Sequence, residues 1–181
     1  MRIIRFQDQS GSVCTGVSQN DGTALKIAGD LFTDYTVTDQ RAQVTRLLAP
    51  IAPPQILCIG LNYRAHAAEI GAPAPQNPVL FIKGINAVQH PEAPIVLPAQ
   101  LPSEQVDYEG ELAVIIGKLC KDVSRKDAPD CVLGYCCAND VSARDWQMRD
   151  GGGQWLSSAQ GRPGVAARCG NAGRAQLRAK A

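Results

Sequence analysis

Residues 106–117 constrain the fold more than any other stretch of the chain. The stretch opens with acids at every second position and continues as β-branched and aliphatic residues up to Gly117, a pattern that predicts a buried strand. Because side chains alternate between the faces of a strand, Asp107, Glu109 and Glu111 are expected to share one face, with about 6.5–7 Å between successive members. Three carboxylates placed in this way repel one another unless water or a cation covers them. Two interpretations follow: a charged edge strand that faces solvent, or a site for a hard divalent cation.

A further acid favours the metal interpretation. Residues 134–138 form a mostly apolar segment that leads into Asp140, which lies 29 residues beyond Glu111. An acid at the end of a strand is held by a rigid scaffold, where site residues are common. Arg144 and Gln147 follow four and seven residues later, and a helical turn over 141–148 would project both in the same direction as Asp140.

Composition indicates a globular protein and excludes two classes of partner. The chain has 181 residues, of which 45% are hydrophobic and 19% charged, and its net charge is +1. We therefore expect neither a nucleic acid nor a membrane as a partner. No apolar run reaches the roughly 18–20 residues of a membrane span, and the N-terminus does not resemble a secretory signal. Seven cysteines without a Cys-x-x-Cys pair indicate reduced thiols, and we expect a cytoplasmic location.

Residues 1–49 are predicted to form a small N-terminal β-rich unit without visible chemistry. Short strands are expected at 2–6, at 13–18 and near 23–27, with turn residues between them. The spacing of Val44, Leu47 and Leu48 predicts a brief helix within 39–48. The prolines at 50, 53 and 54 end this unit and stiffen a linker.

The next segment carries a histidine and a lysine whose roles the pattern leaves open. An apolar strand at 55–60 precedes a short helix over 63–70, with Asn62 as N-cap and Gly71 after its C-terminus. His66 and Glu69 are three residues apart on one face of this helix, which suits either a general base oriented by a carboxylate or a surface pair. A buried strand at 78–84 ends near Lys83, which could neutralise carboxylates or reach solvent. A further short strand is expected at 95–98.

Four ordered motifs resemble the fumarylacetoacetate hydrolase (FAH) family, over roughly residues 47–156. They are residues 56–63 with His66 and Glu69, residues 78–83, residues 106–117 and residues 139–147. The resemblance implies a mixed α+β, predominantly β fold: an FAH-type β-roll or barrel-like catalytic domain, homodimeric when complete. It also implies a bound divalent cation, Mg2+ or Mn2+, with Ca2+ as a further option.

The resemblance implies a role for each candidate site residue. By motif position, the metal ligands would be Glu109, Glu111 and Asp140. His66 with Glu69 would be the catalytic acid–base pair on a lid-like helix, and the substrate would be held by Arg144, Gln147, Tyr63 and Lys83. Family members act on small 2-oxo or 1,3-dioxo acids by C–C hydrolysis, decarboxylation of oxaloacetate-like acids or keto–enol tautomerisation. A cation chelated by the 2-oxo acid group would stabilise the enolate that forms.

The chain departs from the family pattern after Trp155. Ala159 stands where the family has a substrate-polarising lysine, and residues 157–181 contain five basic side chains, no acid and few large apolar residues. We expect this segment to be an unrelated, disordered basic tail, and the chain to be a C-terminally truncated or frame-shifted member with an incomplete catalytic domain over 50–156. The alternative function is therefore an inactive fragment that at most binds a cation.

Overall fold

The computed structural model describes residues 1–97, 99–100, 102–147, 167–168 and 177–179. Strands dominate, and the helical elements among these residues are short. The prediction of a mixed, predominantly β fold is confirmed. No helix in these ranges has the length and the apolar character that a membrane span requires.

The N-terminal unit is an antiparallel meander. It consists of β1 (Arg2–Gln7), β2 (Val13–Ser18), β3 (Thr23–Gly29) and β4 (Tyr35–Gln43), and the short β5 (Arg46–Leu47) returns to pair with β1. Alternation along β1 buries Ile4 and Phe6 against Ala24 on one face. Ile3, on the opposite face, packs against Ile115 and Cys136 of the second part of the chain. Both faces of β1 are therefore buried, and β1 joins the two parts.

The predicted helix within 39–48 is wrong. Residues 35–43 form β4, which pairs with β3 through a register that runs from Thr23 opposite Gln43 to Gly29 opposite Tyr35. Val44 and Leu47 are half-buried against the Ile4–Phe6 cluster, but they reach it from an extended chain. The backbone hydrogen bonds to β3 therefore outweigh the preference for a helix that the spacing of the apolar residues indicates. The strand predicted at 95–98 is not formed at residues 95–97, which lie in an irregular segment, and residue 98 lies outside the described residues.

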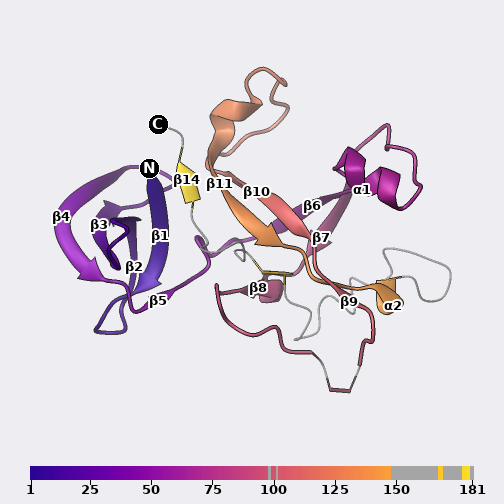
Figure 1. Ribbon diagram of the computed structural model, residues 1–181. Helices are drawn as coiled ribbons and strands as arrows, with labels where there is room; N and C mark the ends of the chain where they lie inside the picture. The colour runs from indigo at the N-terminus through magenta and orange to yellow at the C-terminus, as the bar shows by residue number, and fades with distance from the viewer. Residues whose placement is uncertain (98, 101, 148–166, 169–176, 180–181) are drawn as a thin grey trace.

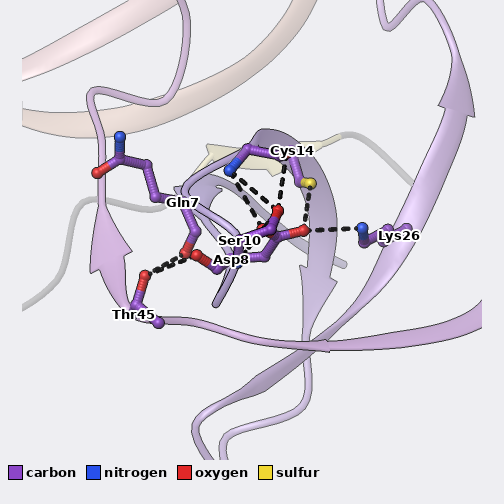
Figure 2. A network of polar contacts seen from close by, with 7 residues as sticks. Gln7, Asp8, Ser10, Cys14, Lys26 and Thr45 are labelled. Carbon is purple, nitrogen blue, oxygen red and sulfur yellow. Dashed lines mark hydrogen bonds and ion pairs between the residues drawn. The ribbon is translucent and has the colours of Figure 1, made fainter.

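A polar network closes the turn between β1 and β2 (Figure 2). One oxygen of Asp8 accepts hydrogen bonds from the Ser10 backbone and hydroxyl and from the Ser12 backbone, and the other lies 3.0 Å from Lys26 Nζ. Thr45 donates to the carbonyl oxygen of Gln7 at 2.8 Å. Hydrogen bonds from Ser10, followed by the one from Lys26, hold the pKa of Asp8 far below its usual value. The carboxylate therefore stays charged and fixes the turn.

The longer strands of the second part of the chain form two pairs. β6 (Ile56–Gly60) and β7 (Val79–Lys83) form a two-stranded antiparallel sheet, with helix α1 (Arg64–Glu69) in the connection between them. β10 (Gly110–Ile116) pairs with β11 (Val132–Asn139), and their connection contains the 3-10 turn η2 (Ala128–Cys131). In Figure 1 this connection projects from one end of the pair, while β9 (Val106–Asp107), β12 (Ser142–Ala143) and α2 (Arg144–Gln147) lie at the other end.

The strand predicted over 106–117 is interrupted. β9 ends at Asp107 and pairs with β12, whereas β10 begins at Gly110 and pairs with β11. Tyr108 and Glu109 lie between the two strands, where the chain changes partner.

A large sheet links the two parts of the chain. Its order is β4-β3-β2-β1-β14-β11-β13-β8, with β10 added beside β11 and β5 beside β1. The remaining members are β8 (Val88–Gln89), β13 (Ala167–Arg168) and β14 (Leu177–Ala179), and the 3-10 turn η1 (Ile85–Ala87) precedes β8. β13 and β14 belong to the segment 157–181, so the structure differs from the predicted disorder at these five residues. The rest of the predicted tail, Ala159 included, lies outside the described residues.

Candidate active site

The register of β10 and β11 places Glu109 opposite Asp140. Gly110 pairs with Asn139 and Glu111 with Ala138, so the next pair outward is Glu109 with Asp140. A backbone hydrogen bond from Asp140 N to the carbonyl oxygen of Glu109 spans 2.9 Å, and Glu109 N donates to Asn139 Oδ1 at 3.1 Å. Residues opposite each other on paired strands have Cβ atoms about 4.5–5.5 Å apart, and diagonal neighbours are about 7–8 Å apart. Glu111 is the diagonal neighbour of Asp140 on the same face.

The three carboxylates differ in their surroundings. Asp140 is 8% exposed, and its Oδ1 accepts no hydrogen bond of acceptable geometry, although the ammonium group of the buried Lys83 forms an ion pair with that oxygen. Burial raises the pKa of the Glu111 carboxyl; a hydrogen bond with Tyr63 opposes this rise, and the charges of Glu109 and Asp140 add to it. Each carboxylate therefore lies within the electrostatic influence of a neighbour.

The donor set suits a hard divalent cation, which prefers carboxylate oxygens. Three carboxylates on one face fit such an ion, and so does the buried Asp140 Oδ1, which has no partner other than the ammonium group of Lys83 among the described residues. Within the described residues, however, no group of three or more His, Cys, Asp or Glu side chains is closed into a metal-binding cluster. Two of the three carboxylates are instead held by internal cations, Asp140 by Lys83 and Glu109 by Arg144.

Arg144 connects several acidic and polar groups at the start of α2. Its Nε donates to Asp107 Oδ2 at 2.9 Å, its Nη1 donates to Gln147 Oε1 at 2.8 Å, and its Nη2 forms an ion pair with Glu109. Burial alone would lower the pKa of Arg144, but the hydrogen bonds from its guanidinium to Glu109 and Asp107 raise it overall. Asp107, which is outside the ligand set that the family resemblance implies, is a partner of Arg144 in the structure.

The segment before β9 is attached to α2. Asp145 accepts hydrogen bonds from Ser103 Oγ at 2.6 Å and from Glu104 N at 3.1 Å, and Trp146 Nε1 donates to the carbonyl oxygen of Pro102 at 3.1 Å. Arg144 N donates to the carbonyl oxygen of Gln105 at 2.8 Å. These bonds hold the start of α2 beside β9. Asp145 and Asn139 are positioning residues that sequence reasoning missed, although both lie inside the motif 139–147.

Helix α1 brings Tyr63 and His66 to the same site. The Tyr63 hydroxyl accepts a hydrogen bond from Leu112 N at 3.2 Å and hydrogen-bonds Glu111, and the charge of His66 acts on Glu111. His66 Nδ1 lies 4.0 Å from Glu69 Oε2, as expected for residues three apart on a helix. The expected Asn62 cap is wrong, since Tyr63 is the N-cap residue and makes no side-chain cap. The predicted role of Gly71 agrees with its φ of 66°.

The nine residues singled out from the sequence thus fall into three connected groups. Tyr63 links α1 to Glu111, Lys83 links β7 to Asp140, and Arg144 links Gln147 to Glu109. Lys83 points inward and is 3% exposed, which decides between the two orientations that the sequence left open. The contacts establish proximity, while the catalytic, metal-binding and substrate-binding roles stay predictions.

The fold and the site define a class of protein: a β-rich domain with a carboxylate cluster at the open end of one strand pair. The fumarylacetoacetate (FAA) hydrolase C-terminal family model matches residues 55–168, and an Rv2993c-like N-terminal model matches residues 1–50. The chain belongs to the fumarylacetoacetate hydrolase family.

Individual relatives agree with this assignment. The chain is 42% identical over 162 residues to Protein Rv2993c of Mycobacterium tuberculosis, which covers 86% of this chain and 60% of that protein. It is 49% identical over 111 residues to a mitochondrial oxaloacetate tautomerase of Xenopus laevis, which covers 61% of this chain and 34% of that protein. The solved structure of a 5-carboxymethyl-2-hydroxymuconate delta-isomerase from Mycobacterium smegmatis superposes with a TM-score of 0.80 at 35% identity, over all of this chain and 68% of the other. The chain therefore spans about a third to 60% of these two curated relatives.

Proposed function

We propose that this chain carries the site of a divalent-cation-dependent enzyme that acts on small oxo acids, with keto–enol tautomerisation as its main reaction. The observation that supports it most is the gathering of Glu109, Glu111 and Asp140 on one face, within reach of His66 and Arg144. Relatives named oxaloacetate tautomerase and muconate isomerase point to the same kind of proton transfer. Hydrolysis of acylpyruvates and decarboxylation of oxaloacetate would use the same enolate chemistry and are the other reactions that the site suits.

Each side chain has a physical task in this proposal. Glu109, Glu111 and Asp140 would hold Mg2+ or Mn2+, and the bound cation would stabilise negative charge on the substrate's oxygen. Arg144 presents a planar guanidinium, which suits the carboxylate of an oxo acid, and Gln147 holds that guanidinium from one side. Lys83 forms an ion pair with the buried Asp140 and holds its side chain in place.

His66 is the candidate for moving the proton. Its Nδ1 faces Glu69, so its Nε2 is the atom available to take a proton from the substrate carbon and return it to the enol oxygen. Tyr63 anchors the start of α1 to β10 through Leu112 N and therefore holds this helix over the carboxylates. The side chain of His66 is 39% exposed, which leaves it open to a substrate that enters from solvent.

The proposal extends to a homodimer and to a cytoplasmic location. Within the described residues no disulfide bond joins the six cysteines, Cys14, Cys58, Cys120, Cys131, Cys136 and Cys137. Reduced thiols are usual in the cytoplasm. The competing function is that of an inactive family fragment that binds a cation at most.

Tautomerisation of oxaloacetate with Mn2+ tests the proposal. We expect the purified chain to accelerate the decay of the enol absorbance, His66→Ala to abolish the acceleration, and Glu109→Ala to abolish both it and Mn2+ binding. Asp39→Asn removes an exposed acid of β4 outside the site and should leave both unchanged. Mn2+ binding without any turnover would favour the fragment, and the absence of both would overturn the proposal.

A further inference from the structure

We propose that Arg144 is an internal counter-cation that holds Glu109 until a divalent cation displaces it, so that metal binding frees the guanidinium for the substrate's carboxylate. This inference rests on the proposed function, because it needs Glu109 to be a metal ligand. It adds an order of events to that function: the cation binds first and the oxo acid second.

The contacts of Arg144 carry the inference. Its guanidinium has one partner that is a candidate ligand, Glu109, and two that are not, Asp107 and Gln147. A cation that approaches Glu109 meets the positive charge of the guanidinium at contact distance. Like charges this close repel strongly in a half-buried setting, so the ion pair with Glu109 and the bound metal compete.

Arg144 can give way without leaving the site. The Nε–Asp107 and Nη1–Gln147 hydrogen bonds involve atoms other than the Nη2 that pairs with Glu109. Loss of the Glu109 contact therefore leaves both anchors in place, and Asp107, whose side chain is 45% exposed, stays beside the guanidinium. Loss of Glu109 then frees one N–H of Nη2 beside the metal ligands, while Nη2 keeps its ion pair with Asp107 Oδ2 at 2.8 Å.

Lys83, the other internal cation, differs from Arg144 because it cannot give up its carboxylate partner. It is 3% exposed, lies against the buried Asp140, and its Nζ is 5.9 Å from the centre of the Phe81 ring. A buried ammonium group that lost its carboxylate would be costly to leave unpaired. Lys83 therefore remains a fixed partner, and Arg144 is the cation that exchanges.

Thermodynamic linkage makes the competition measurable. If the guanidinium lowers the affinity of the site for a cation, its removal must raise that affinity, and coupling between sites is commonly about 5- to 150-fold. An anion that draws Arg144 away from Glu109 must likewise strengthen cation binding, and the cation must strengthen the binding of that anion by the same factor.

Calorimetric titration with Mn2+ alone tests this, on the purified chain and three variants. We expect Arg144→Gln to lower the Kd for Mn2+ at least about fivefold. Asp107→Asn removes the competing carboxylate, so the guanidinium pairs more strongly with Glu109. The Kd for Mn2+ should therefore rise. In the double variant the effect of Asp107→Asn should disappear, because Arg144 transmits it. Mere loss of structure would weaken binding in every variant.

A measurement on the unaltered chain guards against variants that fold poorly. Sodium propionate, a monocarboxylate, should lower the Kd for Mn2+ relative to sodium chloride at equal ionic strength, whereas screening acts equally in both salts. Equal Kd values in the two salts, or an Arg144→Gln variant that binds Mn2+ no more tightly, overturn the inference. The metal site itself fails separately: in that case neither the unaltered chain nor Arg144→Gln binds Mn2+ at all.

Discussion

At the scale of single residues, the Lys83–Asp140 ion pair is the most deeply buried polar contact of the candidate site. Asp140 could be predicted, because it ends an apolar strand near an acidic one. The inward orientation of Lys83 could not, since a lysine at a strand end usually extends its charge to solvent. The two meet only because the end of β7 reaches the residue that follows β11, and that arrangement depends on contacts distant in sequence.

Removal of one member of this pair should be costly. Asp140→Asn leaves the ammonium group of Lys83 buried without a counter-charge, and we expect the free energy of unfolding to fall by about 3–5 kcal/mol in urea titrations. The double variant Lys83→Met, Asp140→Asn removes both charges and should recover most of that loss. If the double variant is as unstable as the single one, the pair is not what stabilises this region.

His90 should make stability depend on pH. Its Nδ1 accepts a hydrogen bond from Ala49 N at 3.2 Å, and burial, with smaller contributions from Arg46 and Arg5, lowers its pKa. The neutral imidazole is therefore favoured in the folded state, so its contribution is complete above the unfolded pKa of about 6.5. That contribution is lost as the pH falls through the lowered folded value.

The variant His90→Gln tests this dependence. Gln can still accept a hydrogen bond but does not titrate, so the difference in unfolding free energy between pH 7.5 and pH 5 should be smaller than in the unaltered chain. Urea titrations at both pH values measure it. An unchanged difference would show that His90 is not responsible.

At the scale of elements, period-two alternation and turn residues predicted most strands of the N-terminal unit and of the 55–83 region. The failures share one cause. Val44, Leu47 and Leu48 are spaced as on a helix, but β3 offers backbone partners to the preceding residues. Residues 106–117 read as one strand, yet their two halves find different partners, β12 and β11. Partner choice is a tertiary property that local sequence does not contain.

The turn between β3 and β4 depends on Gly29. Its φ is +90°, and a Cβ at this position would collide with the carbonyl oxygen of Asp34. We expect Gly29→Ala to lower the unfolding free energy by more than about 1 kcal/mol. Gly11→Ala is the matched control, because Gly11 also has a positive φ of +80° but has no atom within 4 Å of the added Cβ. Thermal unfolding of both variants measures the loss. If Gly29→Ala and Gly11→Ala lower the unfolding free energy equally, the collision with Asp34 contributes nothing.

At the scale of the whole molecule, an aliphatic sheet face lies in solvent. Leu57 pairs with Ile82 and Ile59 with Leu80, so the four side chains share one face of β6–β7, and each is between 39% and 59% exposed. An exposed apolar face of this kind is typical of a surface that another polypeptide covers. The sequence predicted the apolar character of these strands, but not which face would lack a cover.

This face should drive self-association. We expect the purified chain to show concentration-dependent oligomers in sedimentation experiments, and the double variant Leu57→Thr, Ile82→Thr to shift them toward monomer. Val13→Thr, which changes an exposed residue of β2 away from this face, should have no such effect. A monomeric unaltered chain at high concentration would contradict the prediction.

The two ends of the β10–β11 pair differ in how much change they should tolerate. The candidate ligands occupy its open end, whereas the exposed connection at residues 118–130 leaves from the opposite end (Figure 1). Foreign sequence is tolerated best where backbone is exposed and far from chemistry. A peptide tag or a fluorescent protein inserted near residue 122 should therefore leave the carboxylates undisturbed. Such an insertion would allow the protein to be purified or detected.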